Sequence, residues 1–574
     1  MARRFTLGID YGTSSVRAVL VDVATGAEVG TGVSAYASCR DGILTDPADP
    51  HLARQNPQDY LDGLEVSVRD ALDQAVEAEG FSPERVVGIG VDTTGSTPIP
   101  VDAEGRPLAL DPQFSDSLAA HVWLWKDHTG HAEAAEITAH ARAERPEYVA
   151  VCGGTYSSEW FWSKLLRCAR AAPDVFEAAH TWVEHADWMP AVLTGTEHPD
   201  RLQRGVCAAG HKAMYHERWG GYPDTEFLSG LDPRLARVRR TLPDETATAA
   251  DPVGGLTDAW AARLGLPAGT PVAAGAFDAH LGAVGAGIEP GTLVKIIGTS
   301  TCDLMIAPLD QNLGDIPGLC GIVPGSVTPD AYGLEAGQSA VGDIFNWWTA
   351  LLDDDHAVLS EAAERLAPGE SGLVALDWFN GNRTVLVDQR LTGMMVGLSL
   401  ATTRAEVYRA LVEATAFGAR VIMERFEAYG VPVERIVNCG GISAKNALVM
   451  QIYADVMGRP VQISRSDQTC ALGAAMAGAV AAGAEAGGHT DFGAAVDAMT
   501  GVQDHVFTPA PEAAAVYDQL FAVYQTLHDA FGGVEESASL GDVMEELLSI
   551  RDRARQSRTA EPEAASVEAS AHDA

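Results

Sequence analysis

The stretch Gly8-Ile9-Asp10-Tyr11-Gly12-Thr13-Ser14-Ser15 ends one short apolar run and leads directly into another, Val16 to Asp22. This pattern predicts two strands joined by a tight turn of small and hydroxyl-bearing residues. The arrangement returns in the second half of the chain, where Gly298-Thr299-Ser300-Thr301 lies between the apolar runs 293–297 and 302–306. Two such hairpins, one in each half, predict two similar domains that face each other across a cleft.

The chemistry of the two turns indicates a phosphate ligand. Small residues leave backbone N–H groups accessible, and the hydroxyls add further donors, which suits a polyphosphate gripped from both sides. Asp10 adds a carboxylate where a Mg²⁺ ion that bridges the phosphates would sit. The sequence therefore predicts an ATP-using protein. It contains no Gly-x-x-x-x-Gly-Lys-Ser/Thr motif and no Gly-x-Gly-x-x-Gly after a strand, which argues against P-loop and Rossmann proteins.

Length and charge limit the class of partner. The 574 residues are enough for two or more domains with substantial cores. A formal net charge of −40 argues against nucleic acid or an anionic membrane as a partner. The same charge repels ATP, so its affinity must come from local backbone dipoles and a cation.

Cysteine and histidine usage indicates a cytoplasmic protein without zinc. The eight cysteines are scattered and form no Cys-x-x-Cys pair, which is typical of reduced thiols. The first strand begins at residue 5 and leaves no room for an apolar signal region, and no uninterrupted apolar run approaches 18 residues. The 16 histidines show no His-x-x-x-His ligand spacing on a predicted helix.

Lysine is scarce in this chain. Of 39 basic residues only five are lysines, at positions 126, 164, 212, 295 and 445. Coding bias explains such a ratio, but a chain that uses arginine on its surface should keep lysine mainly where a compact point charge is needed. This weak filter draws attention to Lys212, in a segment predicted to be a loop.

The order of predicted elements is strand, strand, helix (57–79) and strand (86–92), which favours an α/β domain with a mixed sheet. Residues 115–250, rich in Trp and His, resemble an insertion that builds a substrate side, and a strand at 271–275 restarts the pattern. After Gly440-Gly441 a helix is predicted with Ser443 as its N-cap.

Several residues are candidates for chemistry, each with a structural alternative. Asp278 follows a strand, where α/β proteins hold ligands, and suits a general base; it would equally serve as the N-cap of a helix that begins at Ala279. Glu335 precedes a predicted helix and would interact with its dipole. Trp123 and Trp125 are more often core residues than ligand contacts.

At this point the chain resembles the FGGY family of carbohydrate kinases. The resemblance covers residues 5 to about 480 in order and rests on ten blocks. The blocks are Asp10 to Ser15, Gly90 to Pro98, Leu124 to Thr129, Tyr156 to Trp162, Ala209 to Lys212, Gly275 to Asp278, Ile297 to Asp303, Glu335 to Ser339, Leu376 to Gly381 and Gly440 to Asn446.

The resemblance implies an α/β fold of two actin-like (ribonuclease H-like) domains that flank an ATP and sugar cleft. It implies an N-terminal domain at 1–289, a C-terminal domain at 290–540, and a short helix with a disordered acidic tail at 541–574. The residue assignments that it implies are a catalytic base at Asp278; sugar contacts at Ser96, Trp125, Lys212 and Glu335; phosphate contacts at Gly12, Thr13, Ser14, Gly298 and Thr299; an adenine side at Gly440, Gly441 and Asn446; and Mg²⁺ at Asp10.

The blocks at 209–212 and 335–339 resemble the ribulose-phosphorylating members of the family in particular. They imply MgATP-dependent phosphorylation of the 5-hydroxyl of L-ribulose, in L-arabinose breakdown. Two alternatives stay open: a kinase for another pentulose or pentitol such as D-ribulose, ribitol or xylulose, and an ATPase of the actin or Hsp70 kind that controls a protein partner. A homo-oligomer is also left open.

Overall fold

The computed structural model of the protein describes residues 3–311, 313–534 and 540–570, with side chains up to residue 556. The chain folds into two units. Unit 1 comprises Met1–Pro290, Leu304–Glu335 and Ser464–Val502, and unit 2 comprises Gly291–Asp303, Ala336–Ile463 and Gln503–Ala574. The last four residues of the predicted tail, 571–574, lie outside the described residues.

A mixed sheet forms the centre of unit 1, as predicted. Its strand order is β10-β11-β6-β1-β2-β3, with β12 also paired to β6. The bounds are β1 (Phe5–Tyr11), β2 (Ser15–Asp22), β3 (Glu28–Ala35), β6 (Val86–Thr93), β10 (Pro252–Gly255), β11 (Pro271–Ala273) and β12 (Ala276–Phe277). β1 and β2 are antiparallel, whereas β1 and β12 each run parallel to β6, so the chain leaves β1, β6 and β12 at the same edge.

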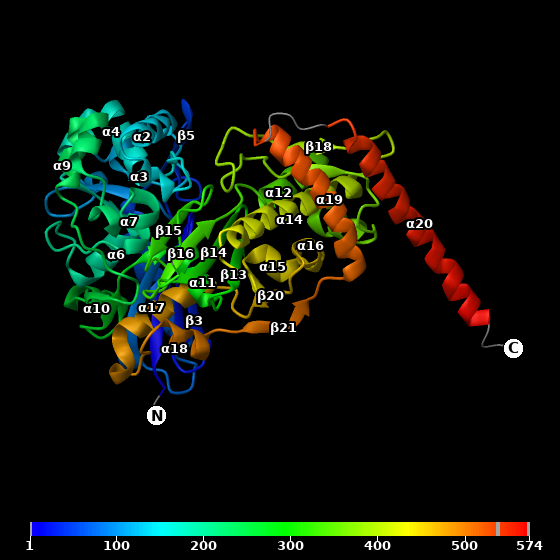
Figure 1. Cartoon of the computed structure of the whole chain (residues 1–574). Helices are drawn as coiled ribbons and strands as arrows, with labels where there is room; N and C mark the ends of the chain where they lie inside the picture. Colours follow the sequence, from blue (N-terminus) through cyan, green and yellow to red (C-terminus); the bar gives the residue numbers. More distant parts are fainter. Residues whose placement is uncertain (1–2, 312, 535–539, 571–574) are drawn as a thin grey trace. The chain divides into compact units, whose positions relative to one another are not determined.

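Helix α17 (Thr469–Ala486) covers this sheet, although it comes from a distant part of the chain. Figure 1 shows the orange helix beside the blue strands. A Cβ atom on Gly8 would lie 1.8 Å from the carbonyl oxygen of Ala471, and one on Gly90 would lie 1.8 Å from that of Ala474. Only glycine in β1 and β6 therefore permits such close packing. α17 is also the one helix in the described residues that is long and apolar enough to cross a membrane; most of its apolar length is buried here.

Helix α11 (Asp278–Gly285) packs beside α17, again through glycine. The remaining helices of unit 1 are α1 (Pro57–Ala75), α2 (His131–Glu144), α3 (Pro146–Ala150), α4 (Phe161–Ala171), α5 (Pro173–Ala178), α6 (His185–Thr194), α7 (Val206–Ala213), α8 (Thr225–Leu231), α9 (Pro233–Arg239), α10 (Asp258–Leu264) and α18 (Phe492–Met499). Its short strands are β4 (Leu44–Asp46), β5 (Asp49–Gln55), β7 (Pro98–Val101), β8 (Val122–Trp123), β9 (Thr181–Glu184), β15 (Gly321–Pro324) and β16 (Ala331–Ala336).

In unit 2 a second strand series runs in the order β13-β19-β20-β21. The bounds are β13 (Thr292–Ile297), β19 (Arg435–Cys439), β20 (Val461–Ser464) and β21 (Val502–Phe507), with β17 (Val374–Leu376) and β18 (Met394–Val396) as a separate pair. β14 (Thr301–Pro308) begins in unit 2 and ends in unit 1. The helices are α12 (Gly342–Leu352), α13 (His356–Glu364), α14 (Arg404–Ala428), α15 (Gly441–Lys445), α16 (Ala447–Met457), α19 (Pro511–Phe531) and α20 (Val543–Ser570).

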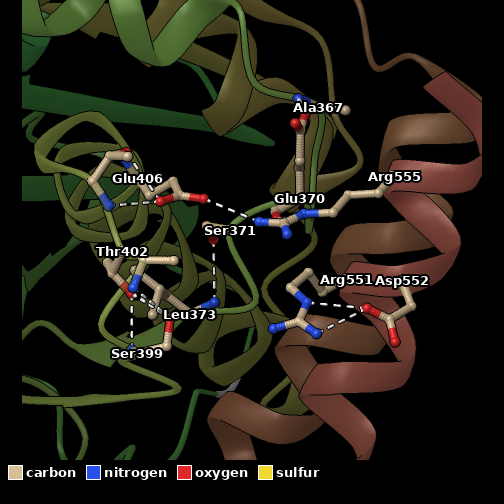
Figure 2. Close-up of polar contacts among 12 residues, drawn as sticks. Ala367, Glu370, Ser371, Leu373, Ser399, Thr402, Glu406, Arg551, Asp552 and Arg555 are labelled. Carbon is tan, nitrogen blue, oxygen red and sulfur yellow. Dashed lines mark hydrogen bonds and ion pairs between the residues drawn. The ribbon is translucent and has the colours of Figure 1, made fainter. Parts of the chain in front are cut away.

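Helix α20 is attached to unit 2 through its first half. Val543, Leu547 and Ile550 are buried, so this half covers apolar surface. Figure 2 shows Arg555, whose guanidinium donates to the carbonyl of Glu370 and to the carboxylate of Glu406. The same Glu406 closes the capping box of α14 through its other oxygen. The first half of α20 is therefore docked on unit 2 through both apolar and polar contacts.

Candidate active site

The first predicted phosphate turn, Gly12-Thr13-Ser14, joins β1 to β2 at the exposed end of the strand pair. The Gly12 N–H donates to the carbonyl of Ser15, which closes the turn. Neighbouring segments hold it from outside, because the Tyr36 hydroxyl donates to the Gly12 carbonyl and the Gln55 side chain to the Thr13 carbonyl. The turn is thus held by contacts within the protein itself.

The second turn, Gly298-Thr299-Ser300, has the corresponding position in unit 2, between β13 and β14. The Gly298 N–H donates to the carbonyl of Ser300, and Gly298 and Thr299 are exposed. Their carbonyls accept from the first residues of α12 and its approach, Val341 and Gly342. The two turns match in residues, as the repeated sequence indicates, but the second is closed by a hydrogen bond to the residue two positions on and the first by one to the residue three positions on.

A pocket of about 760 Å³ in unit 2 opens beside this second turn. Gly298, Thr299, Gly441 and Asn446, four of the residues assigned to ATP, line it together with other residues. Among these other lining residues are Phe345, His356, Tyr408 and Lys445. A mixed aromatic and polar lining of this size suits a nucleoside.

Gly440, also predicted on the adenine side, is not among the lining residues but directly precedes Gly441, which is. Its φ is 95°, a value that favours glycine, and a Cβ there would lie 2.4 Å from the Ile297 carbonyl oxygen. The predicted N-cap after it is wrong: Asn446, not Ser443, caps the longer helix α16 and accepts from the Val449 N–H at 3.1 Å. A short helix, α15, comes first, so Ser443 lies inside it and donates to the Cys439 carbonyl.

Three carboxylates gather where β1, β6 and β12 end in unit 1. Asp10 pairs with Asp92 across the parallel strands, and Asp278 follows β12 directly. Burial raises the pKa of Asp92 well above its usual value, and the neighbouring Asp10 and Asp278 raise it further. Neither oxygen of Asp92 has a hydrogen-bond partner among the described residues other than the neighbouring carboxyl of Asp10. Two adjacent carboxylates, one buried and one partly exposed, fit a hard divalent cation.

Asp278 is the first residue of α11 and is only partly exposed. Its Oδ1 accepts a hydrogen bond from the Ala279 N–H at 2.6 Å. The carboxylate therefore interacts with the N-terminus of α11, although the N-cap residue is Phe277. Burial, and next the charge of Asp10, raise the pKa of Asp278 to about 7. A carboxylate with a pKa near neutrality suits proton transfer at physiological pH.

Lys212 and Glu335 form a buried ion pair near Asp278. The Lys212 ammonium lies 2.8 Å and 2.9 Å from the two carboxylate oxygens of Glu335. Burial alone would raise the pKa of Glu335, but the Lys212 charge, the neighbouring His211 and His280 and the hydrogen bond from Lys212 together outweigh it and hold that pKa well below its usual value. Glu335 lies on β16, so the predicted interaction with a helix dipole is wrong, and Lys212 lies on helix α7 instead of a loop.

Two histidines that the sequence analysis did not single out surround this ion pair. His211 lies 3.3 Å from Glu335 and His280 lies 3.8 Å from it. Burial lowers the pKa of both, to about 4 for His280, so both imidazoles are neutral. The ligand atoms of these three residues lie within 4.8 Å of one another. The Lys212 ammonium binds both oxygens of this carboxylate, which makes the cluster a poor site for a metal ion.

The aromatic block Tyr156 to Trp162 fixes the end of α7 that carries Lys212. The Tyr156 hydroxyl donates to the Lys212 carbonyl at 2.6 Å, and the Trp162 indole donates to the Ala213 carbonyl at 2.8 Å. Both satisfy carbonyls that a helix end leaves without partners. Tyr156 and Trp162 thus position the backbone of Lys212, and Trp160 of the same block presents its ring to the ammonium, with 5.4 Å from Nζ to the ring centroid.

Ser96 and Trp125, the other two predicted sugar contacts, differ in accessibility. Trp125 is partly exposed, and its indole donates to Thr13 Oγ1 at 3.0 Å, which links it to the first phosphate turn. Ser96 is fully buried, and its hydroxyl donates to Glu184. A hydroxyl engaged in this way has only its acceptor side to offer a ligand. Trp123 is a core residue.

Comparison with known proteins identifies the family. Residues 5–285 match the N-terminal domain of the FGGY family of carbohydrate kinases, and residues 293–482 match its C-terminal domain. A ribulokinase of Shouchella clausii is 43% identical over 572 residues, covering 96% of this chain and 99% of that protein. The chain belongs to the FGGY family of carbohydrate kinases. A ribulokinase of Mycolicibacterium smegmatis is 41% identical over 554 residues, covering 92% of this chain and 94% of the relative.

Solved structures of sugar kinases share the fold. The xylulose kinase of Rhodospirillum rubrum is 25% identical with a TM-score of 0.74, covering 92% of this chain and 100% of that one. A ligand-bound xylulose kinase of Lactobacillus acidophilus has a TM-score of 0.75 at 19% identity, covering 93% of this chain and 100% of that one. The predicted two-domain, actin-like α/β fold of the FGGY kinases is confirmed.

Proposed function

We propose that this FGGY kinase transfers the γ-phosphoryl group of ATP to the 5-hydroxyl of L-ribulose, in the breakdown of L-arabinose. The observation that carries the proposal is the buried pair of Lys212 and Glu335, which presents a donor and an acceptor beside the carboxylate of Asp278. The ribulokinase relatives, 40–43% identical over nearly the whole chain, support the choice of sugar.

Phosphoryl transfer needs the protein mainly to align the two reactants and to stabilise charge. The N–H groups and hydroxyls of Gly12, Thr13, Ser14, Gly298 and Thr299 would hold the phosphates. Asp278 would accept the proton of the attacking hydroxyl, and the sugar would contact Lys212, Glu335, Trp125 and Ser96. Gly440, Gly441 and Asn446 would form the adenine side of the unit 2 pocket.

Asp10, with Asp92 behind it, would hold Mg²⁺, which neutralises phosphate charge when bound. We further propose that the enzyme is cytoplasmic and acts on small molecules, without nucleic acid or membrane partners. The net charge of −40 supports the second point, and the lack of any disulfide in the described part of the chain is consistent with the first.

A substrate panel tests the function. ADP release would be followed with L-ribulose, D-ribulose, xylulose, ribitol and glycerol, and without sugar, at fixed MgATP; phosphorus NMR would locate the phosphate on the product. We expect the highest kcat/KM with L-ribulose and phosphate on its carbon 5. A higher value with another pentulose or pentitol would reassign the sugar, and ATP consumption that no sugar stimulates would indicate a regulatory ATPase.

A further inference from the structure

Lys164 is a fully buried lysine that the reaction described above does not use. It lies on α4 with no exposed surface. Its ammonium lies 2.8 Å from the Ser96 carbonyl, 2.8 Å from the Leu124 carbonyl and 3.4 Å from the Trp123 carbonyl. An ammonium has three donors, and three backbone oxygens surround it.

The carbonyls that Lys164 binds belong to two separate segments that carry proposed sugar contacts. One segment is the loop at Ser96 between β6 and β7, and the other leads from β8 into Trp125. Ser96 and Leu124 lie outside the helices and strands, and Trp123 is the last residue of the two-residue strand β8. Lys164 therefore joins the two segments through one charged group.

Glu184 holds the Ser96 loop from its other side. It lies at the end of β9, accepts from the Thr97 N–H at 2.7 Å and also accepts from the Ser96 hydroxyl. Lys164 binds the carbonyl of Ser96 while Glu184 binds its hydroxyl, so the two opposite charges meet through this residue. Both are buried, and among the described residues no direct ion pair joins them.

Burial disfavours the charges of both Lys164 and Glu184, which bears on their role. It lowers the pKa of Lys164 to about 7 and raises the pKa of Glu184, although each charge partly supports the other. Buried opposite charges are weak evidence of net stabilisation, because apolar side chains would fill the same space at a lower desolvation cost. A chain with only five lysines nevertheless places one here. Fixing a conformation accounts for this better than stability does.

We propose that Lys164, together with Glu184, is a positioning residue that sets the sugar-binding conformation of the Ser96 and Trp125 segments. It touches no substrate atom and acts through the backbone that it binds. The inference rests on the proposed sugar site in unit 1, so it concerns binding of the ketose and leaves the nucleotide pocket of unit 2 unaffected.

The test separates the two substrates. Lys164→Met keeps the length of the side chain and removes its three donors. We expect the KM for L-ribulose, and its Kd measured by calorimetry without nucleotide, to rise at least tenfold. The KM for ATP should stay within twofold of the wild-type value.

Lys295→Met is the matched control for the general effect of removing a buried charge. Lys295 is also fully buried, on β13 of unit 2, where its ammonium lies 2.5 Å from Asp303. We expect this variant to lose thermal stability as Lys164→Met does, but to keep the KM for L-ribulose within twofold.

Glu184→Gln keeps the proposal testable if Lys164→Met does not fold. It is nearly isosteric, but its amide offers one acceptor oxygen where two are needed, so the KM for L-ribulose should again rise while that for ATP does not. Folded variants of Lys164 and Glu184 that lose stability but bind L-ribulose normally would reduce both residues to a structural role. Wild-type kinetics test the proposed function separately. If the wild type prefers another sugar, the effects of the variants on the KM for that sugar and on the KM for ATP are compared in the same way.

Discussion

Lys212 and Glu335 lie 123 residues apart in the chain, yet the ammonium of one is hydrogen-bonded to both oxygens of the other. The pair is buried, so each partner depends on the other for its charge. Each side chain holds the other in place, so a ketose would meet a fixed donor and acceptor and would not have to order two long side chains on binding.

Removing one partner of this pair should be more harmful than removing both charges. Lys212→Met leaves Glu335 buried and uncompensated, which by analogy with other buried pairs costs about 3–5 kcal/mol of unfolding free energy. Urea denaturation would measure this loss. The double variant Lys212→Met/Glu335→Gln should lose less than the sum of the single variants, and additive losses would show that the two side chains do not interact in solution.

Replacing the proposed base should abolish turnover and leave nucleotide binding intact. Asp278→Asn keeps the shape of the side chain but cannot accept the proton, so kcat should fall by roughly 10²–10⁴. Calorimetry with ADP should give an unchanged Kd, because the nucleotide pocket lies in unit 2. Near-normal turnover by this variant would contradict the assignment of the base.

The pH dependence follows from the raised pKa of Asp278. Turnover requires the ionised carboxylate, so kcat/KM should fall below about pH 7. The stability effect has the opposite sign. The unfolded carboxyl titrates near 3.9, so between about pH 4 and 7 the folded state binds more protons and its free energy of unfolding decreases as pH rises.

Asp278→Asn should therefore be more stable than the wild type above pH 7, and this advantage should disappear near pH 4. Thermal unfolding at several pH values, without nucleotide or Mg²⁺, measures it. Asp187→Asn is a matched control, because burial also raises the pKa of Asp187 to about 7. Asp187→Asn should change how the free energy of unfolding depends on pH, but it should not change the fall of kcat/KM at low pH. A wild-type stability profile that Asp278→Asn does not change would contradict the raised pKa.

The sequence predicted the parts of this molecule that depend on local pattern. The two Gly-Thr-Ser turns lie between strands as expected, because small residues between apolar runs favour tight turns. The predicted loop at Lys212 is a helix, because tertiary contacts from Tyr156 and Trp162 overcome the weak helix propensity of Gly210. Asn446 was missed as the cap because α15 and α16 are separated by one residue.

The roles of Asp92, Lys164, His211 and His280 could not be predicted from one sequence. Each depends on segments that meet only in the folded chain: Asp92 on Asp10 of the neighbouring strand, and Lys164 on carbonyls 40 to 68 residues away. Lysine scarcity was the available signal for Lys164. Three of the five lysines, at 164, 212 and 295, are indeed buried.

Thr13 should affect both substrates. Its hydroxyl accepts the Trp125 indole hydrogen bond, and its backbone belongs to the first phosphate turn. Thr13→Val should raise the KM for L-ribulose severalfold as well as that for ATP. Ser14→Ala, which changes an exposed hydroxyl of the same turn, should raise only the KM for ATP. Steady-state kinetics with each substrate varied would separate the two, and equal patterns would contradict the link through Trp125.

Truncation tests the role of α20. Removal of residues 557–574 should leave thermal stability and kcat unchanged. Removal of residues 542–574 exposes the apolar surface beneath Val543, Leu547 and Ile550 and should lower the melting temperature by several degrees. Arg555→Ala, which loses partly exposed contacts with Glu406 and Glu370, should cost less than about 1 kcal/mol. An unchanged melting temperature after the longer truncation would contradict this docking.

Helix α17 has a consequence for how the protein is made. The stretch matched by the N-terminal family model ends at residue 285, but the sheet within it is covered by residues 469–486. During synthesis on the ribosome, the glycine-lined face of β1 and β6 stays uncovered until residues 469–486 have been translated. A gene fragment that stops after the first matched stretch would therefore yield an aggregation-prone polypeptide, and a split version of this enzyme should be cut elsewhere.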